Sequence, residues 1–434
     1  MPHRLETAAP GFEAAFESFL TAKREALADV GQEVAAILAQ VRDRGDEALV
    51  SLTERFDDLS LTPDTLRIAP AEIDKALADC DPADLEALTL AARRIRDFHE
   101  RQLPQNLDYR DSLGLRLGHR WTAVEAVGIY VPGGLAAYPS SVLMNAVPAA
   151  VAGVPRIAMT VPAPRGELSP LVLAAARIAG VEEIYRIGGA QAVGALAYGT
   201  ERIPRVDKIV GPGNAYVAEA KRQVFGLVGI DSIAGPSEVL VVADGANDPG
   251  WIAADLLAQA EHDTSAQSIL MTDDPAFAAA VEAALAEQLR DLPKANIAGA
   301  SWEKHGAVIL LERLEQAPAL VDRIAPEHLE LAVAEPEALA GGIRNAGAIF
   351  LGRFSPEALG DYLAGPNHVL PTDRSARFSS GLSALDFMKR SSLIACDREG
   401  LRQLAPTVLR LAEAEGLRAH ARSVAIRLDG EDGT

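Results

Sequence analysis

Apolar residues in the first part of the chain recur at the spacing of amphipathic helices. The pattern predicts helices over 11–57 and over 71–102, with a break near Asp81 and Pro82. Charged residues occupy the positions between them, and no group of side chains in these helices indicates a particular chemistry. We therefore predict that residues 1–121 form a helical N-terminal arm.

The pattern changes near residue 122, where short apolar runs begin to alternate with helical segments. Runs such as AVEAVGIYV and VEEIYRIGG are each followed by a stretch with helical spacing. This alternation is typical of βαβ units that build a parallel sheet. Because it starts again after residue 235, we predict an α/β fold with two Rossmann-like parallel domains, at 122–235 and 236–375. A small helical C-terminal region, 376–434, follows them.

Three glycine-containing loops follow predicted strands of the first α/β domain, where parallel sheets place their ligands. They lie at 130–134, 188–191 and 210–216. Glycine lets backbone N–H groups approach a phosphate or a ribose closely, and the start of a helix favours an anion. None of the loops has the GxGxxG pattern, since 211–216 lacks the third glycine. The spacing is consistent with nucleotide binding and also with ordinary turns.

Polar residues in the second α/β domain suggest a metal site. Gln259 and His262 are three positions apart, which on a helix places their Cβ atoms about 5–6 Å apart on one face. Histidine is a common zinc ligand, whereas the amide oxygen of glutamine is a weak donor. Taken alone, the pair is equally consistent with a surface pair near the end of a helix.

A second candidate is the adjacent pair Glu327 and His328, which can act in general acid–base catalysis. Its alternative is an exposed loop. Ser237, in the run GPSE, either caps the next element or contacts a substrate. Because no GxSxG sequence is present, a serine nucleophile is not indicated.

Asp361 lies near the end of a predicted helix. Ser355 and Pro356 have the residue types of an N-cap and a first helical position, and Gly365 follows the helix. A carboxylate near a helix C-terminus is unfavourable against the helix dipole, and a nearby cation would offset that effect.

His420 is the only histidine of the C-terminal region. A lone histidine on a helix is typical of packing or of a surface position. Together with Gln259, His262 and Asp361, however, it completes a set of four nitrogen and oxygen ligands without cysteine. Such a set suits a divalent metal that orients a substrate.

Charge and composition narrow the classes of function. The net charge of −20 excludes a surface that neutralises phosphates, so nucleic acid and anionic membranes are not expected partners. The two cysteines, Cys80 and Cys396, form no CxxC motif. No apolar run of about 18 residues and no signal-peptide pattern is present. We therefore predict a cytoplasmic protein without membrane spans.

Ten motifs follow one another along the chain: GIYVPGGLAAYPSSVLMNAVPA, GGAQAVGALAYGT, KIVGPGNAYVAEAKR, GPSEVLVVAD, QAEHD with AQSILMT, APEHLEL, NAGAIFLG, GDYLAGPNHVLPT, SGLSALDFMKR and EGLRAHARSVAIR. Together they resemble the histidinol dehydrogenase family, over about 120–428 in sequence and over the N-terminal helices in layout. Leu135 stands where the family commonly has a basic residue, and no role assigned below depends on it.

The resemblance implies a cytoplasmic oxidoreductase of histidine biosynthesis. It would oxidise L-histidinol through L-histidinaldehyde to L-histidine, with two NAD molecules and one Zn²⁺ per subunit. Members of the family are homodimers with exchanged C-terminal parts. By the resemblance, residues 122–235 would bind NAD and residues 236–375 would bind zinc and the substrate. Residues 376–434 would form the dimer.

The resemblance also assigns roles to single residues. The zinc ligands would be Gln259, His262, Asp361 and His420, with His420 supplied by the partner chain. Of the acid–base pair, His328 would take the hydroxyl proton and Glu327 would activate water for the second oxidation. The substrate contacts would be Ser237, Gln259, His262, His328, Asp361, Glu415 and His420. The NAD contacts would be Tyr130, Gln191 and Asn214.

Two other functions remain open from the sequence. One is a zinc- and NAD-dependent dehydrogenase of the same scaffold that acts on another amino alcohol. The other is a non-catalytic α/β binding or scaffold protein, which would need neither the pair Glu327 and His328 nor four residues compatible with a metal.

Overall fold

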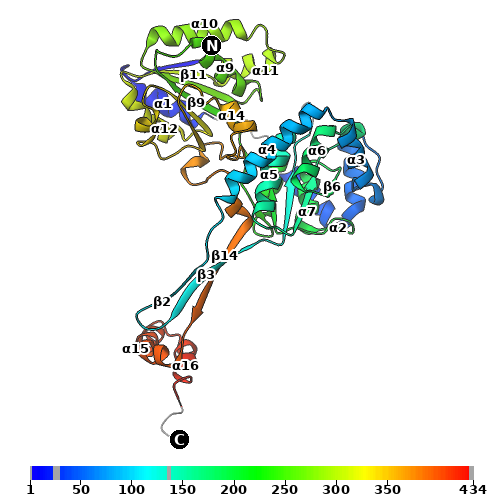
Figure 1. Ribbon diagram of the computed structural model, residues 1–434, viewed down its shortest axis with the longest axis vertical. Helices are drawn as coiled ribbons and strands as arrows, with labels where there is room; N and C mark the ends of the chain where they lie inside the picture. The colour runs from blue at the N-terminus through cyan, green and yellow to red at the C-terminus, as the bar shows by residue number, and fades with distance from the viewer. Residues whose placement is uncertain (1, 23–29, 134–137, 430–434) are drawn as a thin grey trace. The chain divides into compact units, whose positions relative to one another are not determined.

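A computed structural model describes residues 2–22, 30–133 and 138–429 of the chain. It contains two compact units (Figure 1). The first unit comprises Met1–Gln102 and Val124–Phe387, and the second comprises Leu103–Ala123 and Met388–Thr434. Both predicted α/β domains lie within the first unit.

The first parallel sheet, sheet 1, has the strand order β6-β5-β4-β7-β8. Its strands are β4 (Ala126–Tyr130), β5 (Arg156–Thr160), β6 (Glu183–Tyr185), β7 (Lys208–Val210) and β8 (Gly229–Ile230). The helices between them are α5 (Pro139–Val151), α6 (Pro170–Ala179), α7 (Gly189–Tyr198) and α8 (Ala215–Val224). The strand order reverses between β4 and β7, which is the point where such sheets bind ligands.

The second parallel sheet, sheet 2, has the order β1-β11-β10-β9-β12-β13. Its strands are β1 (His3–Glu6), β9 (Glu238–Ala243), β10 (Gln267–Thr272), β11 (Ala307–Leu310), β12 (His328–Ala332) and β13 (Ala348–Leu351). Its helices are α9 (Pro249–Ala260), α10 (Pro275–Gln288), α11 (Ala295–His305), α12 (Ala317–Ile324), α13 (Pro336–Ala340) and α14 (Glu357–Tyr362). When β1 is left out, both sheets have the same order: the third, second, first, fourth and fifth strand along the chain lie side by side. The alternation of strands and helices in the sequence could not show this order.

Sheet 2 is buried on both faces. Along β9, Val239 and Val241 pack with α9 and α10 on one face, whereas Leu240 and Val242 pack with α1 (Phe12–Thr21) and α12 on the other. Because successive side chains of a strand point to opposite faces, a strand covered on both sides is apolar throughout. This explains the unbroken apolar runs that mark the strands in the sequence.

The N-terminal segment is helical in its central part, as α2 (Gly31–Asp57), α3 (Pro70–Asp79) and α4 (Pro82–Glu100). The predicted break before α4 is present, and the Asp81 side chain caps the helix by accepting the N–H of Ala83. The first residues differ from the prediction, because β1 pairs in parallel with β11 at the edge of sheet 2. Four residues are too few to show a helical or strand period.

The second unit is built on an antiparallel sheet of β2 (Leu107–Arg110), β3 (Arg116–Ala123) and β14 (Met388–Ala395). The helices α15 (Arg398–Ala414) and α16 (Arg418–Ala425) follow it. The sequence predicted only helices for 376–434 and for 1–121, and so missed all three strands. The side chains of β2 and β14 are mostly exposed and those of β3 are mostly half-buried, so these strands lack the buried face that makes a strand recognisable in a sequence.

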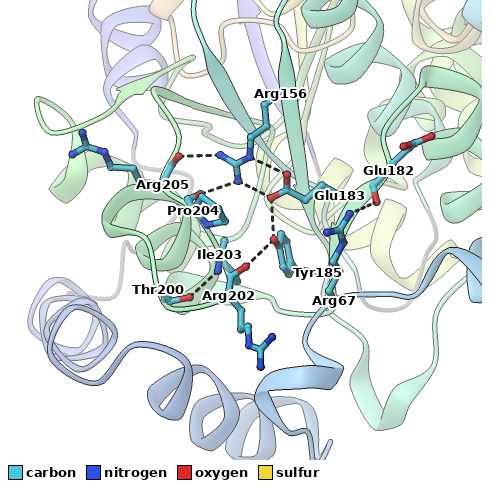
Figure 2. A network of polar contacts seen from close by, with 10 residues as sticks. All are labelled: Arg67, Arg156, Glu182, Glu183, Tyr185, Thr200, Arg202, Ile203, Pro204 and Arg205. Carbon is cyan, nitrogen blue, oxygen red and sulfur yellow. Dashed lines mark hydrogen bonds and ion pairs between the residues drawn. The ribbon is translucent and has the colours of Figure 1, made fainter.

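A polar network closes the edge of sheet 1 where β5 and β6 begin (Figure 2). Arg156 donates to both carboxylate oxygens of Glu183, at 2.9 and 2.6 Å, and to the main-chain oxygens of Pro204 and Arg205. The Tyr185 hydroxyl also contacts Glu183, at 2.9 Å. We call the ion pair of Arg156 and Glu183 the amino-edge clasp. Its hydrogen bonds to Pro204 and Arg205 connect the loop before β7 to sheet 1.

No helix in the described ranges is both long and apolar enough to cross a membrane.

Candidate active site and metal centre

The predicted acid–base pair lies where β9 and β12 begin side by side, at the amino-terminal edge of sheet 2. Glu238 is the first residue of β9, and His328 is the first residue of β12, paired with Val239. Gln259 in the last turn of α9 and Asp361 in that of α14 contribute to the same group of side chains. Sheet 2 therefore carries its candidate site at the edge opposite to the one that parallel sheets usually use.

Glu327 is fixed by a reciprocal pair of hydrogen bonds with Glu238. The Glu238 N–H donates to Glu327 Oε2 at 2.9 Å, and the Glu327 N–H donates to Glu238 Oε2 at 3.3 Å. Both side chains are buried, as is His328, with exposed fractions of 3% for Glu238, 6% for Glu327 and 4% for His328. The alternative of an exposed loop is therefore wrong.

His328 is held as a neutral base. Its Nδ1 lies 3.0 Å from the main-chain oxygen of Glu238, so this nitrogen carries the proton and donates it. Burial lowers the pKa of His328 to about 3. The opposite nitrogen, Nε2, is buried without a hydrogen-bond partner and lies 3.7 Å from Asp361 Oδ1. It can accept a proton from a substrate that enters beside Asp361.

A candidate metal centre adjoins this imidazole. His262, Glu357 and Asp361 each present a ligand atom, and the three atoms lie within 4.8 Å of one another. Burial raises the pKa of Asp361 to about 6, and burial followed by the charge of Asp361 raises that of Glu357 well above its usual value. Glu357 Oε2 is buried without a hydrogen-bond partner. A divalent cation would stabilise both ionised carboxylates, and a set of imidazole and carboxylate ligands suits zinc.

Gln259, a predicted ligand, lies against this cluster with 1% of its surface exposed. When the amide is oriented to satisfy both neighbours, its NH₂ donates to Glu357 Oε1 at 2.6 Å. Its oxygen then accepts the N–H of Glu238 at 2.6 Å. α9 ends at Ala260, so His262 lies in the following turn, where its N–H donates to the Gln259 main-chain oxygen at 3.2 Å.

Glu357 was missed by the sequence analysis, although it stands four positions before Asp361 on the same helix face. The signal was hidden by a wrong helix start, because Pro356 is the N-cap residue and α14 begins at Glu357. Ser355 donates its hydroxyl to Leu351 instead of capping the helix. The first N–H of α14, that of Glu357, donates to Oε1 of Glu330 at 2.6 Å, although Glu330 lies 27 positions earlier in the sequence.

Two further acidic residues, Asp255 and Glu330, lie close enough to Glu357 to raise its pKa. Glu330 of β12 is hydrogen bonded to Asp255 of α9 through their carboxyl groups, so the pair must hold a proton. Burial raises the pKa of Asp255 to about 6 and that of Glu330 well above its usual value. The interior beside the candidate metal centre is therefore rich in carboxyl groups and lacks the apolar lining of an ordinary core.

The remaining predicted substrate contacts fall in two places. Ser237 directly precedes β9 and is partly exposed, and its main-chain oxygen accepts the N–H of Gln267. Since a strand follows it, Ser237 caps no helix. Glu415, the C-cap of α15, and His420 of α16 belong to the second unit, where both side chains are exposed.

The predicted NAD contacts lie at the carboxyl edge of sheet 1. Tyr130 ends β4, and its buried hydroxyl accepts the N–H of Gly189 at 3.1 Å, which joins the first two glycine loops. Burial raises the pKa of Tyr130 to about 12, so the phenol stays protonated. Gln191 is buried in the first turn of α7. Gly134 of the first loop lies outside the described residues.

The third glycine loop follows β7, the strand next to β4. Gly211 has a φ of +111°, and a Cβ atom there would lie 2.1 Å from the Tyr130 main-chain oxygen. Only glycine fits both the backbone conformation and this close approach. Asn214 caps α8 by accepting the N–H groups of Tyr216 and Val217. Tyr130 and the loop 211–214 thus flank the point where the strand order of sheet 1 reverses.

These features define a class of protein: an α/β enzyme with two parallel sheets of one strand order, a buried acid–base pair and a candidate divalent-metal centre. A family model described as histidinol dehydrogenase matches residues 20–428. The chain is 64% identical to the histidinol dehydrogenase of Rhodospirillum rubrum over 99% of both chains, and 61% identical to that of Rhizobium meliloti over the whole of both. The crystal structure of histidinol dehydrogenase from Elizabethkingia anophelis superposes with a TM-score of 0.94, at 35% identity and 98% coverage of each chain. The chain therefore belongs to the histidinol dehydrogenase family, whose members are oxidoreductases.

If zinc binds at the candidate metal centre through Asp361, the raised pKa of this residue predicts how the binding depends on pH. A carboxyl whose pKa is raised to about 6 makes the metal-free fold more stable as the pH falls from 7 towards 4, because the folded state takes up the proton first. Zinc needs the ionised form, so its affinity falls over the same range. We expect the difference in Tm between zinc-loaded and metal-free protein to shrink between pH 7 and pH 5, measured by scanning calorimetry.

The control for this measurement is Asp361→Asn, in which the group no longer titrates. The small Tm difference that remains in this variant should vary less with pH than that of the wild type. A wild-type difference that stays constant from pH 7 to pH 5 would show that Asp361 does not ligate the metal.

Proposed function

We propose that the protein oxidises L-histidinol to L-histidine through L-histidinaldehyde, with zinc and NAD as cofactors. The observation that carries the proposal is the buried Nε2 of His328. It has no hydrogen-bond partner and lies 3.7 Å from Asp361, a member of the candidate metal centre. A proton acceptor and a cation site next to each other suit the removal of a proton from an alcohol.

We infer that His262 and Asp361 hold Zn²⁺ together with Gln259 and with His420 of the partner subunit, one ion per subunit. Glu357 lies against the Gln259 amide, at 2.6 Å. With its NH₂ towards Glu357, the amide oxygen accepts the Glu238 N–H, so binding a cation beside Glu357 would require the amide to turn its oxygen to that side. Bound zinc would orient the nitrogens of the substrate, and bound NAD would accept a hydride in each of two oxidations.

His328 and Glu327 have different acid–base roles in this reaction because their environments differ. His328 is neutral at physiological pH and takes the hydroxyl proton of the alcohol through Nε2. In the second oxidation, Glu327 takes a proton from the water that attacks the aldehyde carbon. Its carboxylate is held by the Glu238 N–H at 2.9 Å, which fixes its direction. Ser237 and the partner's Glu415 contact the substrate in this proposal.

The NAD site is proposed at the carboxyl edge of sheet 1, with Tyr130, Gln191 and Asn214 as contacts. Three observations support it: the reversal of strand order, the close packing of Gly211 on Tyr130, and the start of α8 at the end of the loop. This is the arrangement by which open parallel sheets bind dinucleotides. The residues present therefore fit the cofactor, although the loop is not GxGxxG.

A homodimer is supported by the surface of the second unit. Large apolar side chains are exposed on its sheet and on or beside its helices, and burying them against a partner would be favourable. They include Leu107, Tyr109, Leu393, Ile394, Leu411 and Ile426. A second copy of the chain is the partner we propose for them. The predicted cytoplasmic location stays a prediction.

A spectrophotometric assay tests the proposed function. Purified protein with zinc, NAD and L-histidinol should form about two NADH per histidinol, and excess chelator should abolish the reaction until zinc is restored. A panel of other amino alcohols serves as the control for substrate class. Faster turnover of another amino alcohol, or full activity in the presence of chelator, would refute the corresponding part of the proposal.

Mixed dimers test whether His420 acts across subunits. His262→Ala and His420→Ala should each be inactive alone. When the two variants are unfolded together and refolded, a site with both histidines intact can form, and we expect up to about a quarter of wild-type activity from random pairing. Dimers of His262→Ala with Asp361→Asn are the matched control, because both changes affect the same half-site. If the first mixture is as inactive as the control, His420 does not act across subunits.

A further inference from the structure

A buried ion pair at the carboxyl edge of sheet 1 takes no part in the proposed chemistry. Lys221 of α8 pairs with Asp231, which follows β8, and their side chains are 2% and 5% exposed. Taking two charges out of water is costly, and the cost is recovered only when further hydrogen bonds satisfy both groups. The partners of this pair therefore indicate what it does.

The two charges hold the two peptide groups on either side of Gly211, in the third glycine loop. Lys221 Nζ donates to the main-chain oxygen of Gly211 at 3.0 Å, and the Gly211 N–H donates to Asp231 Oδ2 at 2.8 Å. Gly211 is the residue whose φ of +111° and contact with the Tyr130 oxygen exclude any side chain. Its backbone is thus fixed from three sides, at the start of the loop that ends in Asn214.

We propose that Lys221 and Asp231 are positioning residues for the NAD loop, and this inference rests on the NAD site proposed above. By fixing the directions of the peptide groups before and after Gly211, they hold the segment 211–214 in its bound form before the cofactor arrives. A loop that is already ordered loses less entropy on binding, so the affinity for the cofactor is higher. Neither residue needs to touch NAD.

The same sheet contains a matched control. The amino-edge clasp is also an ion pair with added main-chain contacts, since Arg156 binds Glu183 and the oxygens of Pro204 and Arg205. It lies where β5 and β6 begin, whereas the predicted NAD residues follow the ends of strands. Loss of the clasp should lower stability without a specific effect on the cofactor.

The test compares two double variants, because a single change would leave a buried charge unpaired. Lys221→Met with Asp231→Asn keeps the shapes and an oxygen acceptor for the Gly211 N–H. Arg156→Met with Glu183→Gln is the control. In zinc-loaded protein, we expect the first variant to raise the Kd of NAD⁺ about tenfold in calorimetric titration. The KM for L-histidinol and the zinc content should stay within about twofold of wild type, and the control should lower Tm alone.

Each outcome decides between the proposals. Wild-type affinity for NAD⁺ in the first double variant, or an equal loss in the control, would refute the positioning role. A wild-type protein that does not bind NAD⁺ would instead refute the NAD site, and the inference with it. If the double variant does not fold, Lys221→Arg keeps the charge but changes the donor geometry. It should then weaken NAD⁺ binding in the same direction, and unchanged affinity there would contradict the proposal.

Discussion

The site depends on carboxyl groups that converge where β9 and β12 begin. Glu357 and Asp361 lie together with His262, while Glu330 and Asp255 share hydrogen bonding behind them. Their raised pKa values record a free-energy cost; for Asp361, a pKa of about 6 in place of 3.8 corresponds to about 3 kcal/mol when the group must be ionised at neutral pH. A protein retains such a cost when a bound cation offsets it. Burial lowers the pKa of His328 and keeps its imidazole neutral beside these acids.

The two sheets share one strand order but use opposite edges. Sheet 1 follows the rule for open parallel sheets, because its glycine loops lie at the carboxyl edge where the order reverses. Sheet 2 carries its predicted acid–base pair at the amino edge, where the main-chain N–H groups of Glu238 and Glu327 donate to carboxylates. One architecture thus offers separate positions for the proposed cofactor and for the proposed chemistry. Function follows from the side chains at each edge and cannot be derived from the fold.

The sequence predicted the α/β class from its alternating runs, and the family comparisons confirm it. The strands β1, β2, β3 and β14 were missed, because they are short or have no buried face. Glu357 was missed for a different reason: its helix is capped by Glu330, a residue 27 positions away that local patterns cannot reveal. Likewise, only the fold shows that Lys221 and Asp231 meet at Gly211. The role of each predicted site residue stays a prediction until it is measured.

We infer that a bound cation offsets the free-energy cost of placing the carboxylates of Glu357 and Asp361 together. The thermal stability of the metal-free Glu357→Gln variant tests this central claim most directly. Glutamine keeps the shape and an oxygen for the NH₂ of Gln259, but it removes a carboxyl whose pKa is raised well above its usual value by burial. We expect the metal-free variant to have a higher Tm than metal-free wild type at pH 7, and to gain less from added zinc. A lower Tm in the metal-free variant together with an undiminished gain from zinc would contradict this view of the site.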